Sequence, residues 1–571
     1  MVRYLGYDLF YIENMSLRMD FTKVFSTIKV ILSGKVHRRR GKGFRWSVTG
    51  LVQLLSVLVI MGSAGAQSVD FEVNHWGYEF LDLLAGRGLV EGLNSGFEPL
   101  TRERIGELLE AAKRKLEDDP TVLSENETML LQKLRGEILS DPGSPAAGLI
   151  DRFRERHLYS WREDDSWFAV DALFSLENNI GYADSSGDEN DILRTSAGAR
   201  IRGYLAGNLH FYLSFINTKE EGGDPAISNF DPSQGLPAVA YDGNLYRDDA
   251  IAYLKYRMPW FDLTVGRHRM KWASGRRGSV VLSGNNPPMN GVRLDVRYSN
   301  LAFSSFFGEL DGGAGKKNIA AHRLDILLWE NLRLGTGEVV VYSGRGTEFL
   351  YALPIMPFHI AEHHLGSIDN NTINFDVTYD GLHSMRFYGE LFIDDYKLAK
   401  NPFKHWGNKW AITAGGLFTN PIGFSNSSLR LEYSRIEPYV YTAAPWSPGN
   451  AYKNYDRNLG HWLGPDSDEL YLEYRYTPHW RASVQGAWSE ARRGRLDESF
   501  NIPLPGEEDE KEFLSGTVEN KQTYTIGMVL EVATEQYLSL QYQRISWSNF
   551  GRQDGINRTD DRLFIKWNLD Y

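Results

Sequence analysis

The chain contains 571 residues with a formal net charge of −12 at pH 7, a balance that argues against a general nucleic-acid-binding surface. It has no cysteine, which excludes a disulfide framework and a thiolate metal site. Aromatic residues make up 13% of the chain and glycine accounts for 55 residues, a composition that favours a β-rich protein whose alternate residues face lipid.

The first element in the chain has the pattern of an export signal. An apolar segment runs from Val48 to about Met61, after a cluster of Arg and Lys residues at 38–45 and before Ala64-Gly65-Ala66. This order of basic, apolar and small residues is that of a secretory signal peptide, and an apolar core of about 14 residues is short for a membrane-spanning helix. We expect cleavage after Ala66. Residues 1–66 are then a signal peptide with a long basic leader, which an over-extended translation start would explain.

Residues 67–160 have the pattern of a helical domain. Ile105, Leu108, Leu109, Ala112 and Leu116 share one face at helical spacing, and Thr101 precedes them as a candidate N-cap. Ser124 and Glu127 form an S-x-x-E capping box before a second apolar run, and the prolines and glycine at 141–145 predict a linker. The His75-Trp76-Gly77-Tyr78 stretch and the helix start at Leu100-Thr101-Arg102 resemble an S-layer-homology module, which implies contact with the cell wall.

From Trp167 onwards the apolar residues recur at every second position. Phe168, Val170, Ala172, Phe174 and Leu176 alternate with a mostly polar set, and Leu538, Leu540 and Tyr542 alternate with Ser539, Gln541 and Gln543. Roughly 18 such segments, each about 9–11 residues long, are too many for an open sheet with exposed edges. Long polar stretches, such as 219–246, 441–466 and 491–521, separate several of them, while Pro259-Trp260 and Thr477-Pro478-His479 fit short periplasmic turns.

The end of the chain favours the outer membrane over a secreted β-sandwich, which the alternation alone would also fit. Leu563, Ile565, Trp567, Leu569 and Tyr571 occupy one face of the last segment. A terminal aromatic residue preceded by apolar residues at every second position resembles the signal read by the barrel-assembly machinery. We therefore expect residues 161–571 to form a large antiparallel transmembrane β-barrel with lipid outside it, and the helical domain to lie on the periplasmic side.

The opposite face of the predicted strands is rich in charges of both signs, which a hydrated barrel interior requires and which would also suit an anionic sugar polymer or a small solute. The residues are Arg293, Asp295, Arg297, Arg386, Glu390, Asp394, Arg430, Glu432, Glu473, Arg475, Arg481 and Lys566.

Two further motifs invite an enzymatic interpretation that we do not adopt. His359-Ile360-Ala361-Glu362-His363 matches H-x-x-E-H, a zinc motif that requires both histidines on one helical face and a third ligand. Here it follows Pro354 and Pro357 between strand-like runs, so a loop is expected. Gly344-Arg345-Gly346 lacks the phosphate-loop pattern and is expected to be a turn. No nucleophile, metal or cofactor site is predicted.

The middle of the chain resembles the Wzi capsule-assembly family. The resemblance rests on Gly266-Arg267-His268-Arg269-Met270-Lys271-Trp272, Gly278–Ser283, Asn286-Pro287-Pro288, Ala321–Leu324, Gly337–Tyr342, Tyr351–Pro354, Asp369-Asn370 and Tyr388–Asp395. One departure is Lys271-Trp272-Ala273-Ser274-Gly275, where a Trp-Gly-Pro-Gly-like run would be typical.

The resemblance implies a barrel of about eighteen strands with a periplasmic helical bundle. It also implies a non-catalytic role in attaching capsular or related extracellular polysaccharide to the cell surface. Aromatic rings stack on sugars, while carboxylate, guanidinium and amide groups bind hydroxyls or uronates. The candidate polysaccharide-binding residues are Trp272, Glu338, Tyr342, Arg345, Asp369, Asn370, Glu390, Asp394 and Asp395. The alternative is a porin or solute channel with a helical module that contacts the cell wall.

Overall fold

The computed structural model describes residues 69–90, 96–139, 153–183, 189–222, 236–311, 315–366, 369–443, 447–455, 457–494 and 510–571. The predicted signal peptide at 1–66 and the predicted linker at 141–145 lie outside these residues.

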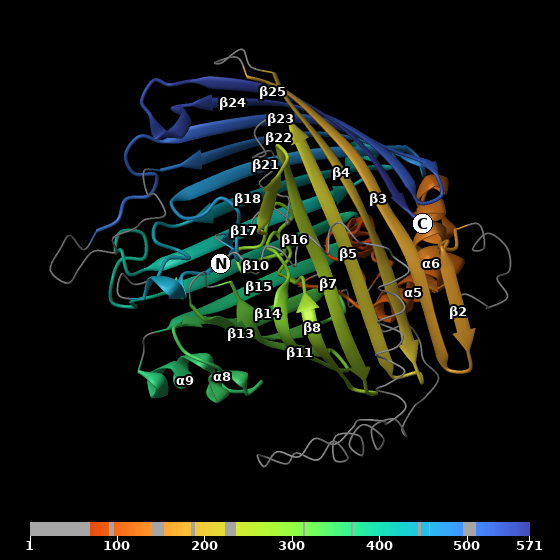
Figure 1. Ribbon diagram of the computed structural model, residues 1–571, viewed down its shortest axis with the longest axis horizontal. Coiled ribbons are helices and arrows are strands. Elements are labelled where there is room, and N and C mark those ends of the chain that lie inside the picture. The colour runs from red at the N-terminus through yellow and green to blue at the C-terminus, as the bar shows by residue number, and fades with distance from the viewer. Residues whose placement is uncertain are drawn as a thin grey trace. The chain divides into compact units, whose positions relative to one another are not determined.

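Eighteen long strands of the described residues form a closed antiparallel barrel (Figure 1). They are β3 (Ser166–Ala183), β4 (Glu189–Leu205), β5 (Leu209–Gly222), β7 (Asn244–Arg257), β8 (Phe261–His268), β11 (Met289–Tyr298), β12 (Leu301–Leu310), β13 (Lys317–Leu328), β14 (Leu332–Ser343), β15 (Asn370–Leu382), β16 (Met385–Asp395), β17 (Lys409–Thr419), β18 (Ser427–Ile436), β21 (Ser467–His479), β22 (Ala482–Arg493), β23 (Glu519–Ala533), β24 (Gln536–Ser548) and β25 (Arg558–Asp570). The last strand closes the wall by pairing with the first, with Trp567 opposite Leu176. Two short strands, β2 (Tyr159–Glu163) and β6 (Ala238–Tyr241), pair with β3 and β7. The predicted fold class is confirmed.

Strand length departs from the expectation. The barrel strands range from 8 residues in β8 to 18 residues in β3, where 9–11 were expected. Residues 219–222, 244–246, 491–493 and 519–521, assigned to polar connections by sequence, are ends of β5, β7, β22 and β23. Polar residues can continue a strand beyond the apolar belt because ladder hydrogen bonds do not depend on which side chains the strand carries.

The connections differ between the two ends of the barrel. At one end, which we call the short-turn end, they span 206–208, 258–260, 299–300, 329–331, 383–384, 420–426, 480–481 and 534–535. At the long-loop end they include 269–288, 344–369, 396–408 and 437–466. Short turns are periplasmic in outer-membrane barrels. The predicted turn at Pro259-Trp260 lies at this end, and Thr477-Pro478-His479 ends β21 there.

Alternation places apolar residues on the outer face of the wall and polar residues inside. In β24, Leu540 and Tyr542 are about 40% exposed on the outer face, whereas Ser539, Gln541 and Gln543 line an internal cavity. Residues of the predicted lumenal set do face inward. Arg293 and Arg386 are buried inside the barrel, and the same cavity is lined by Arg430, Glu473, Arg475, Arg481 and Lys566.

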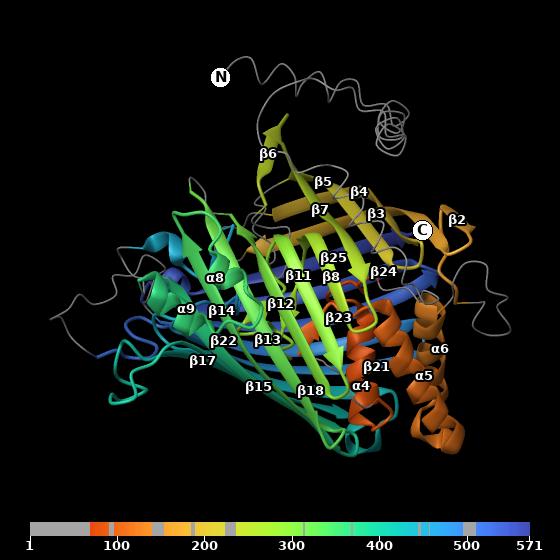
Figure 2. The ribbon, with the colours of Figure 1, turned by 90° about the horizontal axis from the view of Figure 1, so that it is seen from below.

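Three helices of the described segment 69–139 lie at the short-turn end (Figure 2). They are α4 (Trp76–Gly86), α5 (Arg102–Asp118) and α6 (Glu125–Leu139), with the 3₁₀ turn η1 (Pro120–Val122) between the last two. The Thr101 side chain accepts a hydrogen bond from the Arg104 N–H, as expected for an N-cap. The capping box also forms: the Glu127 N–H donates to Ser124 Oγ at 3.1 Å, and the Ser124 N–H donates to Glu127 Oε2 at 2.9 Å. Among the described helices, none is both long and apolar enough to cross a membrane.

The helical domain reaches into the barrel, which the sequence did not indicate. Between α4 and α5 the chain forms β1 (Phe97–Glu98), which pairs with β9 (Lys271–Trp272) inside the wall, and β9 pairs with β10 (Leu282–Ser283). These two short strands belong to connection 269–288, which folds inward from the long-loop end. The domain is also bound to the wall by ion pairs, such as Lys133 Nζ with Glu531 Oε2 at 3.1 Å.

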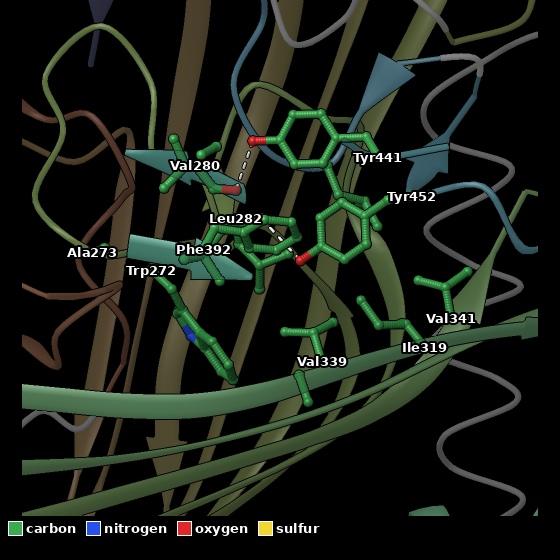
Figure 3. Packing of buried hydrophobic residues seen from close by; sticks show 14 of the residues in the cluster. Trp272, Ala273, Val280, Leu282, Ile319, Val339, Val341, Phe392, Tyr441 and Tyr452 are labelled. Atoms are coloured by element: carbon green, nitrogen blue, oxygen red, sulfur yellow. Dashed lines mark hydrogen bonds between the residues drawn. The ribbon is translucent and has the colours of Figure 1, made fainter. Parts of the chain in front are cut away.

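Residues of two long connections pack together with inward-facing residues of the wall (Figure 3). Val280 and Leu282 of connection 269–288 pack in one apolar cluster with Tyr441 and Tyr452 of connection 437–466. The Tyr441 hydroxyl donates to the Val280 carbonyl at 2.7 Å, and the Tyr452 hydroxyl donates to the Val281 carbonyl at 3.0 Å. We call these two connections the plug loops. The second of them contains η3 (Pro448–Asn450), β19 (Lys453–Asn454) and β20 (Arg457–Asn458). The remaining short elements are η2 (Pro421–Gly423) and η4 (Phe550–Arg552).

The segment with the H-x-x-E-H pattern is helical, so the loop prediction was wrong. The connection between β14 and β15 contains α8 (Phe349–Ala352) and α9 (Phe358–Leu365), and both lie on the outer side of the wall (Figures 1 and 2). A helix forms here because its apolar face can pack on the barrel, a long-range contact that local sequence does not reveal. Gly344, with φ of 77°, begins the expected turn.

Candidate functional site

A large cavity lies on the side of the barrel that the plug loops leave open. Its volume is about 1540 Å³. The wall is formed by the inner faces of β3–β7 and β21–β25, and residues of α4 and α6, including Glu79 and Lys133, border it at the short-turn end. A cavity of this size exceeds that of a typical small-molecule pocket, so it offers room for several sugar units or a solute path.

The middle of the cavity wall carries small, neutral polar side chains. Neighbouring strands contribute Ser175, Ser196, Ser214, Thr523, Thr525, Ser539, Gln541 and Gln543. Hydroxyl and amide groups both donate and accept hydrogen bonds, which suits the hydroxyls of an uncharged sugar face. This part of the wall can form hydrogen bonds with a ligand, but its neutral side chains favour neither an anionic nor a cationic one.

Cations and aromatic rings gather at the long-loop end of the same cavity. We call this group the cation–aromatic cluster; it consists of Arg277, Trp462, Tyr471, Arg493, Lys521, Trp547 and Arg562, all of which line the cavity. Strand ends position most of it: Arg493 ends β22, Lys521 is the third residue of β23, and Trp547 lies directly opposite Lys521 in the ladder. The plug loops contribute Arg277 and Trp462. The cluster therefore depends on both the wall and the loops.

The rings and charges of the cluster are in contact. The Lys521 ammonium lies 5.7 Å from the Trp462 ring centroid and 5.6 Å from that of Trp547. The Arg493 guanidinium lies 5.4 Å from the Trp462 ring, and the Arg277 guanidinium lies 4.7 Å from the Tyr471 ring. Cation–π contacts of this kind hold long basic side chains in place beside aromatic faces.

The charge of the cluster is predominantly positive. Arg277 forms a two-point ion pair with Glu469, with contacts of 2.8 and 3.2 Å, and Arg562 pairs with Asp560 at 3.1 Å. No carboxylate of the described residues forms an ion pair with Lys521, whose electrostatic neighbours are Arg493, Arg277 and Arg562 and one carboxylate, Glu469, which is itself paired with Arg277. A concentration of like charge costs stability unless an anion or water compensates it, so the cluster favours an anionic ligand.

Four of the nine sequence-predicted residues lie inside the barrel and support the plug loops. Glu390 accepts hydrogen bonds from the Gly275 N–H at 2.5 Å and the Val280 N–H at 3.0 Å. Asp394 accepts from the Tyr441 N–H at 2.7 Å, and the Asn370 amide donates to the Asn450 carbonyl at 3.0 Å.

The fourth, Trp272, is 0% exposed in the apolar cluster, so neither face of its indole is open to a sugar in this conformation.

Four others lie on the outer wall around α8 and α9. Arg345 forms ion pairs with Asp369 at 2.5 Å and Glu348 at 2.7 Å, and its guanidinium lies 4.8 Å from the Tyr342 ring. Glu338 accepts from the backbone N–H at the start of α9. Asp395, the ninth, is exposed where β16 ends at the long-loop end. The nine residues thus occupy three separate places and do not form one surface.

Sequence reasoning missed the cation–aromatic cluster, although one signal for it was present. Trp547 lies an even number of positions from Gln541 and Gln543, which were assigned to the polar face of the same strand. Its position inside the barrel therefore followed from the alternation. Arg493 and Lys521 were hidden because they lie in the 491–521 stretch that was assigned to a connection. Trp462 and Arg277 could not be placed, because loops carry no periodicity.

The histidines of the H-x-x-E-H pattern do lie on one helical face. The rings of His359 and His363 are 4.4 Å apart between centroids. Within the described residues, however, no group of three or more His, Asp or Glu side chains is arranged to hold a metal ion. A zinc site needs at least three protein ligands, so the pattern does not identify one here.

Comparison with known proteins adds the decisive observation. The family model described as capsule assembly protein Wzi matches residues 242–561, which is more than half of the chain. The chain belongs to the Wzi capsule-assembly family. It is therefore an outer-membrane β-barrel protein, and the predicted family, fold and location are confirmed. No curated protein matched the sequence significantly.

One solved structure supports the fold of this Wzi-family chain. The Escherichia coli Wzi structure, described as a carbohydrate-binding β-barrel involved in group 1 capsule assembly, aligns over 88% of this chain and 99% of that chain, with a TM-score of 0.55 and 13% identity. Pseudomonas aeruginosa OpdK with vanillate aligns over 70% of this chain and 99% of its own, with 12% identity and a TM-score of 0.40. Pseudomonas aeruginosa OprD covers 71% and 94%, with 10% identity and a TM-score of 0.41. At these identities the likeness concerns the fold alone.

Proposed function

We propose that this Wzi-family protein binds capsular or related extracellular polysaccharide and anchors it at the cell surface, without catalysis. The observation that carries the proposal is the cation–aromatic cluster, which faces the cavity at the long-loop end. Since short turns are periplasmic in outer-membrane barrels, the long-loop end faces the outside of the cell. The polymer-binding description of the Escherichia coli protein is consistent with this role.

The chemistry of the cluster suits an acidic sugar polymer. Trp462 and Trp547 provide flat apolar faces for the C–H faces of sugar rings, and Lys521 and Arg493 provide donors for a carboxylate. The hydroxyl-rich wall below the cluster suits neutral sugar units of the same chain. A polymer segment would therefore enter from the long-loop end with its acidic group beside Lys521. Asn370, Glu390 and Asp394, which the sequence suggested as binding residues, position the cluster indirectly, because they hold the plug loops that carry Arg277 and Trp462.

Binding by the full-length protein tests the proposal directly. Refolded protein is titrated with the purified surface polysaccharide of the source cell, and Lys521→Ala is compared with Lys113→Ala, a matched lysine that is 44% exposed on α5. A hydrogen bond to a charged group contributes about 1.5–3 kcal/mol, so Lys521→Ala should weaken binding about 10- to 100-fold. Lys113→Ala should leave binding unchanged. Equal affinity for both variants would remove the cluster as the binding site.

A cell-level experiment tests the anchoring role. Deletion of the gene should release polymer into the medium while the total amount made stays constant. Complementation with the wild-type gene should restore cell-bound polymer, and complementation with Lys521→Ala should restore less of it. If cell-bound polymer is unchanged by the deletion, anchoring is not the function.

The cavity supports a second candidate, a solute channel. It extends from the long-loop end to residues of α4 and α6, and its middle is polar. The wild-type protein in a planar bilayer should then show stable single-channel conductance that is reduced by an added acidic sugar. A silent barrel under these conditions leaves the polysaccharide role as the sole proposal.

We also propose that β25 carries the signal for the barrel-assembly machinery. Its outward residues Leu563, Ile565 and Trp567 keep the alternating apolar pattern, and Tyr571 has the same spacing. Tyr571→Ala should reduce the amount of folded protein in the outer membrane, measured by heat-modifiable mobility, without changing synthesis. Unchanged assembly would contradict this assignment.

A further inference from the structure

The segment 349–365, which contains α8, α9 and the link between them, exposes four large apolar side chains outside the barrel, beside the exposed His359, His363 and His364 of α9. Phe349 is 83% exposed, Ile355 is 87% exposed, and Leu353 and Ile360 are about half exposed. These side chains point away from the wall, since the opposite face of the same segment is buried against it. Large contiguous apolar surface on the outside of a protein marks an interaction site.

The buried face fixes the helices to the outer wall. Tyr351, Phe358 and Ala361 are fully buried against outward-facing residues of β13 and β14, namely Ala320, Val340 and Tyr342. Two polar groups add to this packing: Arg345 pairs with Asp369, and the Tyr351 hydroxyl donates to the same carboxylate at 2.7 Å. The segment is therefore a fixed part of the wall and its exposed apolar face has a defined direction.

A polar pair on the outer wall shows why the helices are needed there. Glu338 and His322 face outward from β14 and β13, with His322 Nε2 3.0 Å from the Glu338 carboxylate. The Phe358 N–H at the start of α9 donates to the same carboxylate at 2.6 Å, and the Phe358 ring stacks on His322 with 4.2 Å between centroids. Without α9, a carboxylate and an imidazole would face hydrocarbon, where unpaired polar groups are strongly unfavourable.

The height of the helices along the wall can be worked out from β14. This strand begins at Leu332 near the short-turn end, and Tyr342 is ten residues further on. At about 3.4 Å per residue and a tilt of about 40°, Glu338 lies about 15 Å and Tyr342 about 25 Å above the start of the strand. The apolar belt of such barrels is about 25 Å tall. Helices α8 and α9 therefore lie across the upper edge of the belt.

We propose that α8 and α9 form an interfacial anchor whose exposed apolar face inserts into the outer leaflet, at the boundary between headgroups and acyl chains. The partner is lipid. The lipid-facing surface of β14 and its neighbour β15 is apolar as well, since Leu334, Phe375 and Val377 are exposed on the outer wall.

The absence of cysteine makes a depth measurement direct. Single-cysteine variants of the full-length protein carry a nitroxide label and are reconstituted into phospholipid vesicles. Ile355→Cys and Phe349→Cys report on the anchor. Leu334→Cys, on the outer wall, is the lipid control, and Asp554→Cys, exposed in the connection between β24 and β25, is the water control. Both anchor positions are highly exposed, so labelling should not disturb folding.

The expected result is that the labels at 355 and 349 collide with oxygen and are shielded from a water-soluble nickel complex, as at 334. A pattern like that at 554 would overturn the proposal. Low access to both reagents, with dipolar broadening between labels that grows with protein density, would also overturn it, because a second copy of the chain would then cover the face. The measurement is independent of polysaccharide binding.

Discussion

Asp70 offers a sharp test of how the helical domain is held in the barrel. Its carboxylate accepts two hydrogen bonds from Arg293, at 2.8 and 3.0 Å, and pairs with Lys255. The two cations are 1% and 0% exposed. Burial alone would raise the pKa of Asp70, but Arg293 and Lys255 outweigh it and hold the pKa below its usual value. Asp70→Asn keeps the shape of the side chain and removes the charge.

The loss can be estimated from the environment of the two cations. Arg293 keeps a second partner in Asp295 at 2.8 Å, whereas the buried Lys255 ammonium loses its ion-pair partner. Removing one member of a buried ion pair costs about 3–5 kcal/mol. At about 1.4 kcal/mol per factor of ten, the opening that separates the helical domain from the wall should become roughly 100- to 4000-fold more populated.

Hydrogen–deuterium exchange of the full-length protein measures this opening. Amide protection in α5 and α6 should fall by about two to three and a half powers of ten in Asp70→Asn. Glu117→Gln, which breaks the exposed Lys113–Glu117 pair at 3.7 Å, should change protection less than threefold. Adding Lys255→Met to Asp70→Asn should recover part of the loss, because no unpaired ammonium remains. Similar protection in Asp70→Asn and Glu117→Gln would refute the reasoning.

Three further predictions concern other elements. Ser124→Ala removes the capping box of α6 and should lower the stability of the helical domain by about 1 kcal/mol, measured by the same exchange experiment, while the exposed Thr121→Ala should have a smaller effect. Burial raises the pKa of Glu137 to about 7, and Lys133 only partly opposes this, so the folded domain takes up a proton that the unfolded chain does not. Stability should therefore fall by about 1 kcal/mol as the pH rises from 6.5 to 8.5, and Glu137→Gln should abolish that slope; an equal slope in both proteins would contradict the assignment. Glu390→Ala leaves two buried backbone N–H groups of a plug loop without their acceptor, at a cost of about 2–6 kcal/mol. It should produce or increase fluctuating conductance in planar bilayers, and a trace identical to wild type would show that the loop is held by other contacts.

The barrel and the chemistry of its two faces could be predicted from the apolar periodicity of the chain. The period of two fixes which side chains share a face, because successive residues of a strand point to opposite sides of the sheet. It therefore placed Ser539 and Gln541 inside and Leu540 outside without knowledge of the strand order. The helix caps at Thr101 and Ser124 were also predictable, because a cap is made by residues three positions apart.

Long-range packing determines which part of the barrel is filled and which is open, and this could not be predicted. The plug loops carry no periodicity, and their contacts, such as the one from Tyr441 to Val280, join residues that are 161 positions apart in the chain. The same holds for β1, which leaves the helical domain to pair with β9. In the structure, the candidate residues Asn370, Glu390 and Asp394 hold the plug loops by hydrogen bonds. This role could not be predicted, because a carboxylate that supports a loop and one that binds a ligand are identical in sequence.

For the cation–aromatic cluster and the outer helices, too, the sequence pattern predicts some features and long-range contacts determine the others. Alternation assigns Trp547 to the lumen, but it does not bring Trp462 and Arg277 beside Lys521, because two of these three come from loops. The H-x-x-E-H segment became a helix because the wall of β13 and β14 offered an apolar surface and a carboxylate at its first turn. Local sequence determines on which side of a strand or helix a side chain lies, whereas the residues that it contacts depend on parts of the chain that are distant in sequence.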